Sequence, residues 1–240
     1  MISRNDFVLL KSLLSSRVMI ATLVLLLSFD TVLLVMHIIY VYFEYHLLEA
    51  EHDLSSFNMN EDGTYSEIFE YLKNILIIFT LAGSWYRNRQ LIFLTLSAIF
   101  IFTLVDNIFQ LHERFGEFVS PLLQSTTQYF DTAPAALGEF LFYAAIGPAL
   151  LGSLTLALFR AREEYHVYGV IFLILLILLG GFGVGVDLIH SALIDMKGLD
   201  SWTMLSGPLD KILGFVEDGG ELIILSIICA LSCAIYARSR

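Results

Sequence analysis

The sequence predicts an all-α protein, a polytopic integral membrane helical bundle with six transmembrane helices and both termini in the cytoplasm. Three observations lead to this prediction. Hydrophobic residues make up 57% of the 240 residues and charged residues 15%, and the mean hydropathy of +0.76 is typical of a polytopic membrane protein. Apolar runs of about 20 residues, the length that crosses the hydrocarbon core, recur along the chain. Basic residues gather in alternate loops, as the positive-inside rule describes.

The six predicted spans follow one another with short connections. They cover residues 18–43, 68–86, 90–113, 137–159, 167–194 and 209–236. Arg87 and Arg89 separate the second span from the third. Pro134 precedes the fourth span, where proline can begin a helix, and Pro148 is expected to kink that helix. Because no room for a soluble domain remains, we expect residues 1–240 to form a single transmembrane helical bundle domain.

Four glycines lie close together in the fifth predicted span. They are Gly180, Gly181, Gly183 and Gly185. Small residues let a neighbouring helix approach closely, which is the preferred interpretation of the run. The alternative is that the backbone leaves room beside Asp187.

The basic residues also predict the orientation. Those that precede, separate or follow the spans on one side are Arg4, Lys11, Arg17, Arg87, Arg89, Arg160, Arg162, Arg238 and Arg240. The positive-inside rule places that side in the cytoplasm, and we expect the protein in the plasma (inner) membrane. Residues 44–66 form an acidic external loop with six Asp or Glu and no Lys or Arg. The lipid bilayer is the expected partner of the apolar spans. An acidic outer face attracts cations and repels anions, so nucleic acid is not an expected partner.

Acidic residues inside the apolar runs are the most informative feature of the chain. Each costs at least about 2.5 kcal/mol on insertion, so such residues usually mark a functional site. Successive residues of a helix are about 100° apart, so residues three, four and seven apart share a face. The groups that meet this test are Asp106, Gln110 and Glu113; Glu139 and Tyr143; Asp187 and His190; and Asp210, Gly214, Glu217 and Glu221. All lie in the outer halves of the predicted spans.

These residues predict a polar site that faces the external or periplasmic side, which we interpret as a metal site. Carboxylates this close cannot all ionise without a counter-charge, and carboxylates with one or two imidazoles suit hard or borderline cations. The predicted ligands of a divalent metal ion are Asp106, Glu113, Asp187, His190, Glu217 and Glu221. Glu139 is the candidate catalytic base, or else a further ligand, and His112 is expected to point away from the Asp106 stripe.

Other interpretations of the same residues remain open. Carboxyl pairs that share protons, or the cations Lys73, Arg114 and Lys211, would neutralise the site without a metal. The leading function is a metal-dependent membrane enzyme. The alternatives are a proton- or cation-coupled transporter and a non-catalytic subunit that packs with other membrane subunits or as a homo-oligomer. A transporter needs a pathway to both sides, and the cytoplasmic halves of the spans carry few ionisable residues.

Overall fold

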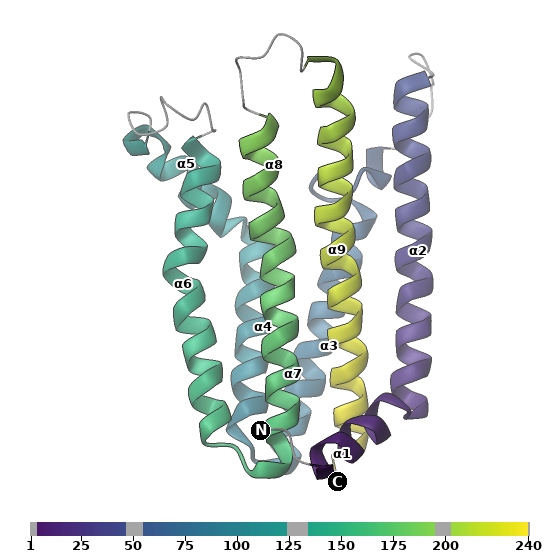
Figure 1. The fold of residues 1–240 in the computed structure, drawn as a ribbon, viewed down its shortest axis with the longest axis vertical. Helices are drawn as coiled ribbons and strands as arrows, with labels where there is room; N and C mark the ends of the chain where they lie inside the picture. Colours follow the sequence, from purple (N-terminus) through teal and green to yellow (C-terminus); the bar gives the residue numbers. More distant parts are fainter. Residues whose placement is uncertain (1–3, 47–54, 124–133, 195–202, 240) are drawn as a thin grey trace.

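The computed structural model describes residues 4–46, 55–123, 134–194 and 203–239, and within these ranges all regular structure is helical (Figure 1). The elements are α1 (Arg4–Leu14), α2 (Arg17–His46), η1 (Ser55–Phe57), α3 (Tyr65–Asn88), α4 (Leu91–Phe109), α5 (Leu111–Leu123), α6 (Pro134–Phe159), α7 (Glu163–Gly180), η3 (Gly181–Val186), α8 (Asp187–Ile194) and α9 (Thr203–Arg238). The element η1 is a 3₁₀ turn, and η3 is a π-helical turn that joins α7 to α8.

Six of the described segments are long and apolar enough to cross a membrane, which confirms the predicted number. They are Arg17–Phe43, Tyr65–Asn88, Leu91–Phe109, Pro134–Phe159, Glu163–His190 and Lys211–Arg238. The predicted bounds agree with these to within four residues. One of the differences matters for the site, because α4 ends at Phe109 and Glu113 therefore lies on α5.

The long helices run alternately up and down, and the described chain begins and ends at the same end of the bundle (Figure 1). The arginines at the helix ends gather there, and we call it the basic end and the opposite one the acidic end. The helix α9 is the most buried of the six and packs against α2, α3, α7 and η3. The α3–α4 connection is a tight turn in which Arg89 adopts a left-handed conformation (φ 54°) and donates its backbone N–H to Trp85 O at 2.7 Å.

Apolar side chains fill the half of the bundle near the basic end. The buried residues there include Ile77, Leu81, Phe93, Leu96, Phe100, Leu154, Phe172, Ile228 and Ile235. Large apolar side chains such as Phe79 and Phe159 are exposed on the outside of the helices, as expected for lipid-facing surfaces. The bundle is thus closed by packed side chains at its basic half, and polar side chains concentrate in the other half.

The predicted loop 44–66 is shorter than expected, because α2 extends to His46 and α3 begins at Tyr65. Its residues 47–54 lie outside the described residues. In the described part, the Met59 backbone N–H donates to Nδ1 of the buried His37 at 3.1 Å. Asn58 is only 4% exposed and donates to Glu61 Oε1 at 2.8 Å. These contacts hold the segment against the acidic end of the bundle.

Candidate functional site

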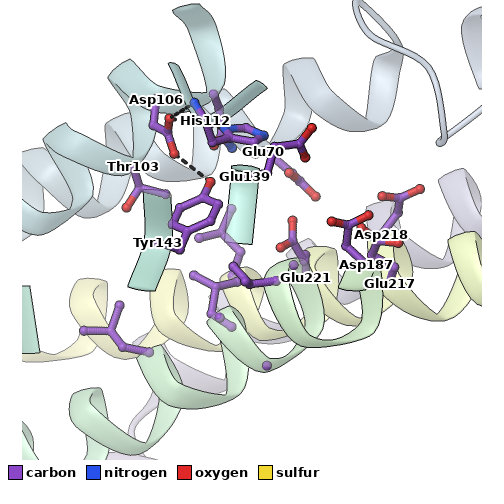
Figure 2. Close-up of a pocket in the computed structure, with 18 of the residues that line it drawn as sticks. Glu70, Thr103, Asp106, His112, Glu139, Tyr143, Asp187, Glu217, Asp218 and Glu221 are labelled. Carbon is purple, nitrogen blue, oxygen red and sulfur yellow. Dashed lines mark hydrogen bonds and ion pairs between the residues drawn. The ribbon is translucent and has the colours of Figure 1, made fainter. Parts of the chain in front are cut away.

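A cavity of about 890 Å³ lies between α3, α4, α6, α9 and the α7–η3–α8 helix, at the acidic end of the bundle. Eleven acidic side chains line it: Glu61, Asp62, Glu67, Glu70, Asp106, Glu113, Glu139, Asp187, Glu217, Asp218 and Glu221. Among the described residues no Lys or Arg lines the cavity, and His112 is the one histidine that does. Figure 2 shows Asp106, His112 and Tyr143 on one wall and the acids of α8 and α9 on the facing wall.

Asp106 is held in a hydrogen-bonded group with His112 and Tyr143. Its Oδ1 accepts from the His112 backbone N–H at 3.1 Å and contacts His112 Nδ1 at 3.2 Å. Its Oδ2 accepts from the Tyr143 hydroxyl at 2.7 Å. Asp106 is 1% exposed, so the carboxylate has exchanged water for these partners. Both oxygens are therefore engaged, and one of them caps the start of α5.

Two predictions about this region were wrong: that Asp106, Gln110 and Glu113 share one helix face, and that His112 points away from Asp106. Both errors have one cause. Gln110 adopts a left-handed conformation (φ 50°) and ends α4, with its N–H donating to Asp106 O. The chain restarts as α5, so Asp106, Gln110 and Glu113 do not form one stripe. The same break changes the direction of the chain so that His112 contacts Asp106. In an uninterrupted helix, His112 would point away from Asp106.

Glu113 lies beside His112 on α5, with 3.7 Å between Glu113 Oε1 and His112 Nε2. Partial burial, with the nearby charge of Asp62, raises the pKa of Glu113 above its ordinary range. Burial alone would lower the pKa of His112, but the hydrogen bond to Asp106 and the charges of Asp106 and Glu113 outweigh it. The pKa of His112 is therefore raised above the ordinary value of 6.5.

A raised imidazole pKa makes the stability of this corner depend on pH. The stabilisation by protonated His112 is complete below its unfolded pKa of 6.5 and is lost as pH rises through the higher folded value. We expect the melting temperature of the protein to fall as the pH rises above 6.5, and that of His112→Gln to fall less. Thermal melts of both proteins across this range check it. Parallel curves would contradict a role for His112.

The facing wall is built by α8, α9 and the π-helical turn η3. It carries Asp187, Glu217, Asp218 and Glu221 (Figure 2). His190 Nδ1 lies 3.4 Å from Glu217 Oε2, so the predicted α8 residues do meet α9. His190 itself is not among the residues that line the cavity.

Three of the four glycines do not serve the close helix packing that was expected. A Cβ added at Gly180, Gly181 or Gly185 would meet no atom within 4 Å. A Cβ at Gly183 would instead collide with the carboxylate of Glu221. Gly183 therefore makes room for Glu221, whereas the alternative interpretation expected room beside Asp187. The run forms a π-helical turn, and such turns are frequent at functional sites.

Glu139 lies on α6 between the two walls (Figure 2). Its position follows from the close packing of α5 on α6 at Gly116 and Gly138. A Cβ at Gly116 would lie 2.8 Å from Glu139 Cγ, and one at Gly138 would lie 2.7 Å from Gly116 Cα. Glycine at both positions thus lets the two helices approach and sets Glu139 at the cavity wall.

Glu70, Asn74 and Asp218 also line the cavity, although none of them was among the predicted ligands or the predicted base. Glu70 and Asn74 are four residues apart on α3, so the facing test applied to the other spans could have found them. Asp218 directly follows Glu217, and no spacing signal distinguishes it.

A buried ion pair lies one turn from Glu70 along α3. Lys73 Nζ lies 3.2 Å from Asp30 Oδ1 and donates to Leu222 O at 2.8 Å, and Ser226 Oγ donates to Asp30 Oδ2 at 2.6 Å. Lys73 and Asp30 are each 1% exposed. Lys73 is thus the counter-charge of Asp30 on α2. One interpretation expected Lys73 to neutralise the site, but Lys73 does not line the cavity.

Six of the seven predicted site residues line the one cavity: Asp106, Glu113, Glu139, Asp187, Glu217 and Glu221. They do not converge on a point. Among the described residues, no group of three His, Cys, Asp or Glu is placed to hold a metal ion. The carboxylates instead lie around the walls of a cavity of about 890 Å³.

The fold and the cavity define a helical protein with six segments of membrane-spanning length and an acidic cavity at one end. A family model, described as a domain of unknown function (DUF8692), matches residues 69–235, and the chain belongs to this family. The match includes α4 to α8 and most of α3 and α9, the helices that line the cavity. No curated protein and no solved structure matches the chain.

Proposed function

We propose that this chain is an integral membrane protein that binds a cationic ligand in its acidic cavity. The observation that carries the proposal is the lining of eleven acidic side chains without Lys or Arg among the described residues. Like charges at this density oppose one another, and a bound cation relieves that repulsion. The cavity also concentrates cations from solution through its local field.

The orientation proposed for the protein follows from its two ends. Arginines at the basic end support a cytoplasmic location for that end in a plasma membrane. The cavity then faces the external or periplasmic side. The apolar packing of the basic half closes the cavity toward the cytoplasm, which favours a binding or catalytic site over a pathway that spans the bundle.

Cysteine labelling tests this orientation. Ser56 is exposed in η1 at the acidic end, and Arg160 is exposed after α6 at the basic end. Asn58 is unsuitable because it is buried. In a chain with Cys229 and Cys233 changed to Ala, we expect an impermeant maleimide added to whole cells to label Ser56→Cys. Arg160→Cys should react after the cells are opened, and the reverse pattern would invert the topology.

A metal-dependent membrane enzyme is the second candidate. The contact of His190 with Glu217 is the observation that favours it, because an imidazole and a carboxylate are ligands that suit a divalent ion. Such an ion would keep part of its water shell or draw the side chains inward. Glu139 would then serve as the base that takes a proton from the bound water. Elemental analysis of the purified protein should find one or two such ions per chain if this candidate holds.

Binding measurements test the proposal and use a matched pair of glycines. Isothermal titration of the protein in nanodiscs with spermidine, Na⁺, Mg²⁺ and Zn²⁺ should reveal at least one saturable cation. Gly183→Ala displaces the Glu221 carboxylate and should weaken binding about tenfold, as should Glu221→Gln. Gly180→Ala places its methyl group in open space at the same wall and should bind as the parent does. The absence of saturable binding by any cation would overturn the proposal.

A further inference from the structure

The cavity changes character along its length. On α6 its lining runs from Glu139 to Leu151, a distance of about 18 Å at 1.5 Å per residue. The acidic residues lie toward the acidic end. Farther in, the lining continues with Leu150, Leu176, Ile177 and Leu225. The cavity thus combines an anionic outer part with an apolar inner part.

Asn74 stands where the two parts meet. It is the innermost residue that α3 contributes to the lining, one turn below Glu70. Its side chain is buried, at 1% exposure, and its Oδ1 has no hydrogen-bond partner. On α9, Glu221 precedes the apolar Leu225 by one turn in the same way. A buried carbonyl oxygen without a donor is unfavourable, so this position calls for a ligand that brings an N–H or O–H group.

We propose that the cavity binds a primary alkylammonium ion. This inference rests on the proposed function and names the class of its cationic ligand. The ammonium group donates its N–H bonds to Asn74 Oδ1 and to the carboxylates of Glu70 and Glu221. The alkyl chain lies along Leu150, Leu176 and Leu225 toward the closed half of the bundle.

Three observations favour this cation over other kinds. A metal ion held directly by side chains usually takes three or more of them, and the described residues offer no group of three His, Cys, Asp or Glu placed to do so. A quaternary ammonium has no N–H for Asn74. A small hydrated ion would leave the apolar part of a cavity of about 890 Å³ unused.

Titration with a series of amines tests the inference. The full chain in nanodiscs is titrated with propyl-, butyl-, pentyl- and hexylamine, and empty nanodiscs correct for partition into lipid. Burial of each added methylene should tighten binding about fourfold. Hexyltrimethylammonium, which has the chain without N–H donors, should bind at least tenfold more weakly than hexylamine. These comparisons use the unaltered protein.

Two substitutions locate the ammonium group. Asn74→Leu keeps the side-chain size and removes the acceptor, and it should weaken hexylamine binding about tenfold. Asn107→Leu makes the same change elsewhere on the cavity wall and should alter it less than twofold. Melting curves confirm that each variant is folded.

The possible failures are distinct. If cations bind but affinity is independent of chain length or of N-methylation, the alkylammonium inference is wrong and the proposed function stands. Equal effects of the two asparagine substitutions would also overturn it. If neither amines nor inorganic cations bind, the proposed function itself is wrong.

Discussion

Lys73→Met is expected to lower the free energy of unfolding by about 3–5 kcal/mol, because it leaves Asp30 as a buried carboxylate without a counter-charge. Asp30 and Lys73 are each 1% exposed, and their pair joins α2 to α3. Lys73 also donates to Leu222 O on α9, so the substitution affects three helices at once. Denaturant titration in mixed micelles measures the change.

A second variant separates charge from packing. In Asp30→Asn with Lys73→Met, no buried charge remains, and most of the lost stability should return. Lys11→Met removes an exposed lysine from α1 and should change stability by less than about 0.5 kcal/mol. If the double variant is as unstable as Lys73→Met alone, the buried charge is not the cause of the loss.

Asp106→Ala should be the next most damaging substitution, with an expected loss of about 3 kcal/mol. It removes the acceptor of three contacts: the His112 backbone N–H, His112 Nδ1 and the Tyr143 hydroxyl. A donor left unsatisfied in a buried place costs roughly 1–3 kcal/mol, and the start of α5 also loses its cap.

Tyr143→Phe provides the comparison, because it removes a single donor and leaves the other Asp106 contacts in place. We expect a loss of about 1 kcal/mol. The same denaturant titration ranks the two variants. An equal loss in both would mean that Asp106 does not hold α5 in place.

Hydropathy and charge were enough to predict the helical class and the six long apolar helices. They were enough because bilayer thickness sets the length of an apolar run, and the run can be read without knowing how the helices pack. The depth of the acidic residues along the predicted spans was enough to predict that they lie near one another. Asp106, Glu139, Asp187 and Glu221 all line one cavity. This depth depends on the position of a residue along its helix, and that position can be read directly from the sequence.

The contacts within the site could not be predicted in the same way. Gln110 is neither glycine nor asparagine, so nothing in the sequence marks it as the left-handed residue that ends α4. That single turn decides whether His112 meets Asp106. The partner of Lys73 was equally hidden, because Asp30 lies 43 residues away and the pairing of α2 with α3 is a tertiary property.

The length of the π-helical turn Gly181–Val186 affects how α8 faces the cavity. A π turn holds about one residue more than an α turn, and each residue advances a helix by about 100°. A single-codon deletion in this turn would shorten the helix by only about 1.5 Å, yet it would rotate Asp187 and His190 away from α9. Such a deletion would keep the bundle and remove the α8 side chains from the facing wall of the cavity. We therefore expect the length of this turn to determine whether α8 contributes side chains to the cavity.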